Sequence, residues 1–246
     1  ITNLELIKTY FEDKNFDFVV NCAAYTAVDK AEDDQEKAFL VNAKAVEYLA
    51  IITAEKNIPF IHVSTDYVFD GTEAKPRLET DQTNPIGVYG ETKLQGEEFA
   101  LNNNPQTIIL RTAWVYSRFA NNFVKTMLRL FSEKDSLSVV SDQIGSPTNA
   151  LDLAKVILDI ISKDDLVYGI FNYSNEGECS WFDFATKIKE FSGATIEINP
   201  VPTSAFPTKA KRPAYSLLDK TKIKETYQVD VPSWEDSLKQ ELKHLV

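Results

Sequence analysis

The chain has 246 residues, of which 43% are hydrophobic and 26% charged, a composition typical of a folded globular protein with one or two domains. Its formal net charge of -11 at pH 7 argues against nucleic acid or an anionic membrane as the main partner, because both would repel it. The two cysteines, Cys22 and Cys179, lie far apart and favour a reducing compartment, so we expect a cytoplasmic protein. The apolar runs are only strand-sized, which predicts no membrane span.

Strands and helices are predicted to alternate along most of the chain. Short apolar runs indicate the strands, and Ala, Leu and Val at helical spacing indicate the helices between them. The predicted strands are 16–24, 59–65, 106–116, 137–140 and 168–173, and the predicted helices are 35–56, 89–101, 120–133, 149–162 and 181–191. Such alternation is typical of a parallel sheet covered on both faces. The sequence therefore predicts an α/β fold, a Rossmann-type doubly wound parallel sheet with a smaller C-terminal lobe.

Tyr89 and Lys93 stand four residues apart in a predicted helix, so their side chains share one face. A nearby ammonium lowers the pKa of a phenol and makes it a usable proton donor. Thr65 ends the buried strand upstream, where its hydroxyl can donate to a carbonyl oxygen while the tyrosine delivers a proton, as ketone reduction requires. The spacing alone is weak evidence, because Tyr10 and Lys14 repeat it and a surface pair also satisfies it.

Seven sequence blocks follow one another in a fixed order: NCAAYTAVDKAE (21–32), STDYVFDG (64–71), NPIGVYGETKLQGE (84–97), RTAWVY (111–116), NNFVKTMLRL (121–130), DQIGSPT (142–148) and RPAYSLLDKTKI (212–223). Together they closely resemble the dTDP-4-dehydrorhamnose reductases, a family of the extended short-chain dehydrogenase/reductase group. The resemblance spans nearly the whole chain. A single block would not separate this family from the sugar epimerases of the same group.

The resemblance implies an NADPH-dependent reduction, with NADH as the alternative cofactor. The C4 ketone of dTDP-4-dehydro-L-rhamnose would be reduced to dTDP-L-rhamnose. Thr65, Tyr89 and Lys93 would form the catalytic triad: Tyr89 protonates the C4 oxygen, Thr65 hydrogen-bonds it, and Lys93 also binds the nicotinamide ribose. The cofactor-binding residues implied in this way are Ala23, Ala24, Tyr25, Val63, Tyr89 and Lys93.

Five residues match substrate contacts of the family. Thr65 and Asp66 would meet the sugar, Trp114 would lie against its ring, and Asn121 would line the same side of the cleft. Arg212 would bind the diphosphate, because a guanidinium can hold two phosphate oxygens at once. Without the resemblance, Trp114 is better explained as a core residue, and Arg212 is equally well explained as part of a solvated basic loop.

Asn42 lies in the middle of a predicted helix. It is interpreted as an exposed asparagine, with membership of a proton relay as the alternative. Metal chemistry is poorly supported, since His62 and His244 are the only histidines and cannot assemble a zinc site. No carboxylate cluster can be matched to the Mg²⁺ that some family members carry at a dimer contact, so the sequence leaves Mg²⁺ open.

The chain departs from the family at its beginning. A Rossmann-type cofactor site needs a Gly-rich turn between its first strand and first helix, yet no glycine precedes Gly71. We expect that roughly forty to fifty residues of the family pattern, including this strand, turn and helix, are absent before Ile1. A chain without them is predicted to bind NADPH weakly, and its exposed sheet edge would favour association, for example as a homodimer.

Two domains are predicted. Residues 1–115 and 137–172 would be the NADP(H)-binding Rossmann-like domain, and residues 116–136 and 173–246 the substrate-binding lobe. The expected partner is a dTDP-sugar. Two alternatives stay open: another nucleotide-sugar reductase or epimerase, and a non-catalytic subunit resembling the regulatory β-subunit of methionine adenosyltransferase.

Overall fold

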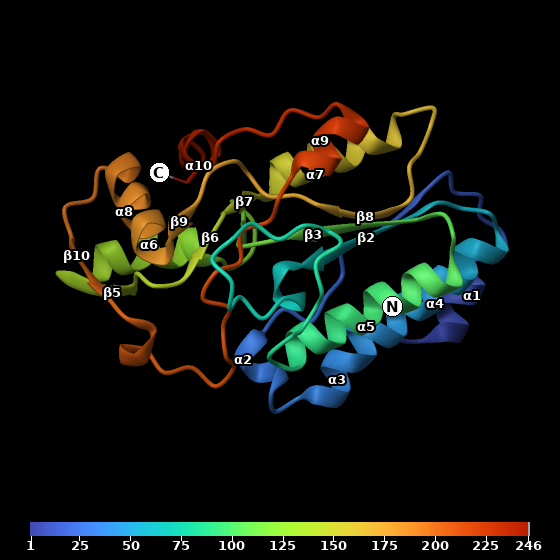
Figure 1. The fold of residues 1–246 in the computed structure, drawn as a ribbon, viewed down its shortest axis with the longest axis horizontal. Coiled ribbons are helices and arrows are strands. Elements are labelled where there is room, and N and C mark those ends of the chain that lie inside the picture. The colour runs from blue at the N-terminus through green and yellow to red at the C-terminus, as the bar shows by residue number, and fades with distance from the viewer. Residues whose placement is uncertain (246) are drawn as a thin grey trace.

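The computed structural model describes residues 1–245, and its centre is a four-stranded parallel sheet in the order β1-β2-β3-β8 (Figure 1). The strands are β1 (Val19–Asn21), β2 (Phe60–Thr65), β3 (Thr107–Thr112) and β8 (Gly169–Asn172). Every neighbouring pair is parallel. The two central strands, β2 and β3, are buried almost throughout, which agrees with their near-continuous apolar sequences.

Helices cover both faces of this sheet (Figure 1). Alternate residues of β2 face opposite layers: Phe60 packs with the helices of one face, and Ile61 with those of the other. The helices beside Phe60 are α1 (Leu4–Glu12), α4 (Ala45–Glu55) and α5 (Val88–Asn103), and those beside Ile61 are α7 (Ala150–Ile161) and α9 (Thr221–Tyr227). This arrangement confirms the predicted α/β fold with a doubly wound parallel sheet.

The second lobe contains a small parallel sheet of its own. It pairs β5 (Ser136–Val140) with β10 (Glu197–Val201) in continuous register, beside α6 (Phe123–Glu133) and α8 (Trp181–Ser192). The expectation that strand 137–140 continues the main alternation is therefore wrong, because its hydrogen-bonding partner lies 61 residues further along the chain. The predicted division into two domains stays a prediction. Within it, β5 belongs with residues 173–246, because it pairs with β10.

Short elements connect the two layers and the lobe. The remaining helices are α2 (Val28–Ala31), α3 (Gln35–Phe39), α10 (Trp234–Leu242), a π-helical turn (Leu40–Lys44) and 3-10 turns at Asp66–Val68 and Thr203–Ala205. Two more strand pairs are formed by β4 (Val115–Tyr116) with β7 (Thr148–Asn149) and by β6 (Ile144–Gly145) with β9 (Cys179–Ser180).

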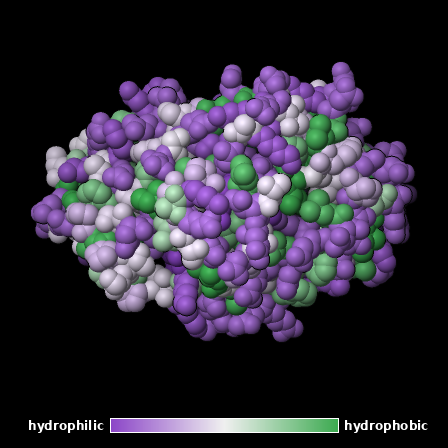
Figure 2. Space-filling model, in the orientation of Figure 1, coloured by the Kyte–Doolittle hydropathy of each residue, from purple (hydrophilic) through white to green (hydrophobic). Residues whose placement is uncertain are grey.

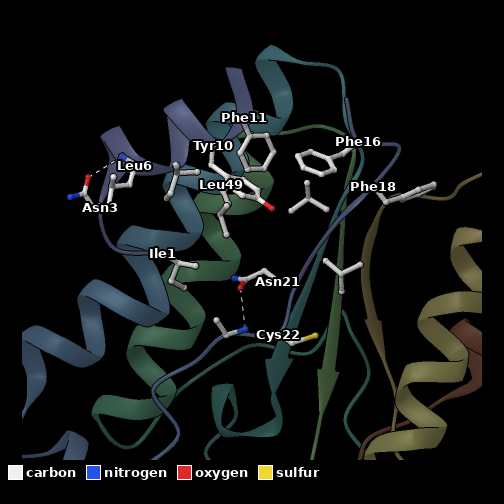
Figure 3. A pocket seen from close by; sticks show the side chains of 14 residues that line it. Ile1, Asn3, Leu6, Tyr10, Phe11, Phe16, Phe18, Asn21, Cys22 and Leu49 are labelled. Carbon is white, nitrogen blue, oxygen red and sulfur yellow. Dashed lines mark hydrogen bonds between the residues drawn. The ribbon is translucent and has the colours of Figure 1, made fainter. Parts of the chain in front are cut away.

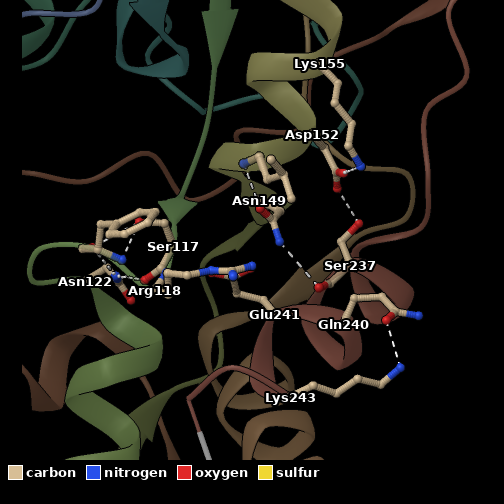
Figure 4. A network of polar contacts seen from close by, with 12 residues as sticks. Ser117, Arg118, Asn122, Asn149, Asp152, Lys155, Ser237, Gln240, Glu241 and Lys243 are labelled. Carbon is tan, nitrogen blue, oxygen red and sulfur yellow. Dashed lines mark hydrogen bonds and ion pairs between the residues drawn. The ribbon is translucent and has the colours of Figure 1, made fainter.

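A polar network ties α7 to the C-terminal helix α10 (Figure 4). The Ser237 hydroxyl donates to the carboxylate of Asp152, and the amide of Asn149 donates to the backbone carbonyl of Ser237. Beside them, the buried Glu241 carboxylate forms an ion pair with Arg118, with 2.9 Å between Nη2 and Oε2. Because Asn149 and Asp152 lie at the start of α7 and Ser237 lies in α10, the network fixes how α10 sits against α7.

Hydrophilic side chains dominate the face of the molecule shown in Figure 2, and apolar side chains gather there only in small groups. None of the helices described for residues 1–245 combines the length and the apolar character needed to cross a bilayer.

The predicted helix 35–56 is interrupted by the π-helical turn, and this changes the position of Asn42. Asn42 is fully buried, with 0% of its surface exposed, so its interpretation as an exposed residue is wrong. Its side chain accepts from the backbone N–H of Tyr25 at 2.7 Å and donates to the Thr92 hydroxyl at 3.1 Å. The reason is tertiary: the backbone carbonyl of Asn42 packs directly against Gly96 of α5.

We expect Gly96→Ala to destabilise the protein although alanine favours helices. A Cβ at position 96 would lie 2.1 Å from the Asn42 carbonyl oxygen, and overpacking costs about 1–3 kcal/mol, more than the roughly 1 kcal/mol of helix propensity gained. Urea unfolding measures the change, and exposed Glu98→Ala in the same helix is the matched control. A Gly96→Ala protein as stable as the wild type would show that the two helices separate at little cost.

Candidate active site

The carboxyl ends of β2 and β3 open into a cleft of about 510 Å³, here called the main cleft. Ligands of open parallel sheets bind at this edge. Seven of the predicted site residues line it: Ala24, Val63, Thr65, Asp66, Tyr89, Lys93 and Trp114. The fold thus brings together, from four separate stretches of sequence, the residues that spacing alone could not connect.

Tyr89 is held at the cleft by the packing of the first turn of α5. A Cβ at Gly90 would come 2.2 Å from the backbone oxygen of Tyr67, so only glycine lets α5 approach the end of β2 so closely. The α5 N-cap residue Gly87 makes no side-chain cap. Instead the carboxylate of Glu32 accepts from the backbone N–H of Val88 at 3.0 Å, a favourable interaction at the positive end of a helix.

The acidity of Tyr89 differs from the expectation. Burial raises the pKa of Tyr89 to about 12, and the interaction of its phenol with the Thr65 hydroxyl only partly opposes this. The predicted lowering by Lys93 is absent, because the Lys93 ammonium is engaged elsewhere and does not contribute to this pKa. In the structure as described, Tyr89 is therefore a protonated phenol at neutral pH and holds the proton that a donor needs.

Lys93 is buried, with only 1% of its surface exposed. Its ammonium donates to the Val63 carbonyl at 2.7 Å and lies 3.2 Å from Nε2 of His62. Burial lowers the pKa of Lys93 to about 8, and the carboxylate of Glu97 acts in the opposite direction. Burial and the Lys93 charge also hold the pKa of His62 well below its usual range, so this ring is neutral and adds no competing charge.

Asp66 presents an unsatisfied oxygen in the main cleft. Its Oδ1 accepts from the Thr65 hydroxyl at 3.0 Å. Its buried Oδ2 makes no hydrogen bond of good geometry among the described residues, although the nearby Ser216 hydroxyl partly opposes the effect of burial on the pKa of this carboxyl. Burial raises the pKa of this carboxyl to about 6. A buried acceptor without a donor is costly, so the site fits a ligand that brings hydroxyl groups.

A buried ion pair underlies the end of β2. Glu97 and Arg111 are exposed by only 1% and 2%, and the Nε and Nη2 atoms of Arg111 hold the carboxylate side-on at 2.7–3.1 Å. The Ser64 hydroxyl also donates to Glu97. This pair locks α5, β2 and β3 together directly beneath the residues that line the cleft.

Trp114 lies at the bend between β3 and β4 and has a left-handed backbone, with a φ of 48°. Its ring stacks on Trp181, with 3.6 Å between centroids and 11° between planes. Positive φ is rare for a bulky residue and is retained where the surroundings impose it. Trp181 lines the main cleft as well; sequence reasoning missed it, because it lies in a helix of the other lobe.

A further hollow of about 440 Å³, here called the second cavity, lies between α6, β5 and the segment 206–212. Its lining is mostly apolar and includes Trp181, Phe206 and Arg212. Because Trp181 lines both the main cleft and the second cavity, the two spaces meet at this residue.

Four of the predicted site residues lie outside the main cleft. Figure 3 shows a hollow between α1 and β1. Ala23 lines this hollow, because successive residues point to opposite sides of an extended chain. The Tyr25 phenol donates to Asp34, and Asn121 is exposed just before α6. Arg212 lines the second cavity.

Among residues 1–245 no group of three or more His, Cys, Asp or Glu side chains is placed to hold a metal ion.

The family described as "RmlD substrate binding domain" matches residues 1–246. The chain is 41% identical over 249 residues to the dTDP-4-dehydrorhamnose reductase of Aggregatibacter actinomycetemcomitans, covering 97% of the chain and 85% of that protein. It is 46% identical over 231 residues to the enzyme of the same name from Sinorhizobium fredii, covering 90% and 78%.

Solved structures agree with these matches. The dTDP-4-dehydrorhamnose reductase of Bacillus anthracis, in complex with NADP, superposes with a TM-score of 0.95 at 36% identity, over 99% of this chain and 86% of that one. The corresponding structure from Clostridium acetobutylicum has a TM-score of 0.95 at 42% identity, with the same coverage. The chain therefore belongs to the dTDP-4-dehydrorhamnose reductase family.

Proposed function

We propose that the protein reduces the C4 ketone of dTDP-4-dehydro-L-rhamnose to dTDP-L-rhamnose with NADPH, a step in nucleotide-sugar and cell-surface polysaccharide biosynthesis. The convergence of Thr65, Tyr89 and Lys93 in the main cleft carries this proposal. Relatives named for the reaction and a neighbour in complex with NADP support it. A regulatory subunit without activity would not need these three side chains in one cleft.

The residues of the cleft divide the reaction between them. NADPH, when bound, supplies the hydride that reaches C4. The Tyr89 phenol gives its proton to the carbonyl oxygen, so that the ketone becomes a secondary alcohol, and it later regains a proton from solvent. The buried Lys93 ammonium would hold the nicotinamide ribose, and the Thr65 hydroxyl, which donates to Asp66 in the structure, donates to the carbonyl oxygen of the substrate.

The two adjoining spaces fit the parts of a nucleotide-linked sugar. The sugar occupies the main cleft, where Asp66 Oδ2 accepts from a hydroxyl and Trp114 lies against the ring. The base occupies the mostly apolar second cavity, and Arg212 at its lining takes the diphosphate between them. Small side chains at Ala24 and Val63 leave room for the cofactor along the main cleft.

The direct test is to incubate the full-length protein with NADPH and dTDP-4-dehydro-L-rhamnose, following NADPH absorbance and identifying the sugar by NMR. We expect NADPH consumption matched by dTDP-L-rhamnose formation. A product with the opposite C4 configuration would assign another nucleotide-sugar reductase, and no consumption would contradict reductase activity.

We expect a bell-shaped pH dependence of kcat/KM, with limbs near the two perturbed pKa values. As pH falls through about 6, Asp66 gains a proton and loses its negative charge. The neutral carboxyl accepts hydrogen bonds from the sugar hydroxyls more weakly. As pH rises through about 8, Lys93 loses its proton and with it the positive charge that would hold the nicotinamide ribose. Rates measured from pH 5 to 10 test this, and Asp66→Asn should remove the acidic limb alone; an acidic limb that persists in this variant would assign it to another group.

A further inference from the structure

Arg212 is bound by a carboxylate from a segment far away in the sequence. Its Nη2 donates to Oδ2 of Asp29 at 2.6 Å, and its Nη1 donates to Oδ1 of the same carboxylate at 3.1 Å. Asp29 belongs to α2, which follows the stretch Ala23–Tyr25 next to β1. Asp29 also accepts from the backbone N–H of Ala210 at 3.0 Å, so it organises the segment that carries Arg212 as well as the side chain itself.

The contacts made by Arg212 leave one particular edge of its guanidinium unused. A guanidinium has five N–H groups. Nη1 donates one N–H to Asp29 and the other to the Ala210 carbonyl, and Nη2 donates one N–H to Asp29. The Nε–H and the second Nη2–H remain without a partner among the described residues. In this chain Arg111 and Arg118 use these same two nitrogens to hold a carboxylate side-on.

The unused edge has the geometry that two phosphate oxygens require. Arg212 lines the second cavity, and its charge also acts on Tyr67, which lines the main cleft. The guanidinium therefore lies at the space assigned to the base, and its charge reaches a residue of the space assigned to the sugar. An arginine held end-on at this point has lost much of its side-chain freedom before any ligand arrives, which reduces the entropic cost of binding.

We propose that Asp29 is a positioning residue for the substrate: it holds Arg212 end-on so that the Nε–Nη2 edge receives the diphosphate of the nucleotide-linked sugar. This inference rests on the proposed function. It assigns to α2, part of the predicted cofactor-binding domain, a share in substrate affinity. Asp29 would instead compete with the diphosphate if it occupied the Nε–Nη2 edge of Arg212. It binds Nη1 and Nη2 from the end of the guanidinium.

The experiment measures dTDP binding to the full-length protein by calorimetry. The proteins compared are the wild type, Asp29→Ala, Arg212→Ala and the double variant. We expect Asp29→Ala to weaken dTDP binding by roughly tenfold, the loss of one charge-assisted contact. We expect the double variant to bind no more weakly than Arg212→Ala, because Asp29 acts only through that side chain. NADPH affinity should be unchanged in all of them, which also verifies folding.

Asp33→Ala is the matched control. It removes a neighbouring carboxylate that pairs with Lys209 of the same segment, and we expect it to leave dTDP affinity unchanged. Asp29→Asn keeps an acceptor for Ala210 and for Arg212 and should recover part of the affinity. In turnover, Asp29→Ala should raise KM for the dTDP-sugar with little change in kcat.

Equal or tighter dTDP binding by Asp29→Ala, or additive losses in the double variant, would overturn the inference and leave the proposed function intact. Failure of the wild-type protein to bind dTDP would contradict the proposed substrate class itself, and the inference with it.

Discussion

Replacing Tyr89 with phenylalanine is expected to lower kcat of the full-length protein by about 10²–10⁴-fold, the contribution typical of a positioned proton donor. The phenol keeps its proton at neutral pH, since burial raises its pKa to about 12, and it is the group of the proposed triad that gives a proton to the carbonyl oxygen. Removing one oxygen leaves the packing of the ring against Tyr67 in place. NADPH affinity should therefore remain nearly unchanged.

Steady-state rates and an NADPH titration of the same preparation separate the two effects. Tyr10→Phe is the control, because Tyr10 has the same spacing to a lysine but is 58% exposed, lies in α1 and does not line the main cleft. Turnover of Tyr89→Phe close to that of the wild type would refute the proton-donor role. A parallel loss of NADPH binding would instead assign Tyr89 a role in holding the cofactor.

Replacing Arg111 with methionine is expected to destabilise the fold by about 3–5 kcal/mol, because it leaves a buried carboxylate without its counter-charge. Glu97 would keep only the Ser64 hydroxyl as a donor, at a place where α5, β2 and β3 meet. The effect is measured as the free energy of unfolding in urea. Since 5–15 kcal/mol is the usual total stability of a domain, this loss should also be visible as a large fall in melting temperature.

Arg129→Met provides the comparison, since both side chains of the Arg129–Glu133 pair are exposed. Such exposed pairs contribute about 0–1 kcal/mol to the free energy of unfolding. A second comparison is the double replacement of Glu97 and Arg111 by methionine. Replacing a whole buried pair with apolar side chains is often close to neutral, so the double variant should be more stable than Arg111→Met alone. If it is less stable, the Glu97–Arg111 ion pair itself stabilises the fold.

Much of the main cleft was predictable from local patterns. Thr65 ends an apolar strand, and Tyr89 and Lys93 share one face of a helix, features set by the period of the backbone. The block order added Ala24, Asp66 and Trp114, and all of these line one cleft. Local patterns do not show which hydrogen-bond partner each of these side chains finds in the fold. The acidity of Tyr89 was therefore mispredicted, because Lys93 binds Val63 and lies against His62 instead.

By itself the sequence determined the alternation of strands and helices, the parallel sheet and the spacing of Tyr89 and Lys93, because these depend on residues close together along the chain. The tertiary structure alone decided which distant residues meet. It buried Asn42 against Gly96, paired β5 with β10 and stacked Trp114 on Trp181. These contacts join segments tens of residues apart, and each depends on packing and hydrogen-bond satisfaction in three dimensions, which no local spacing encodes.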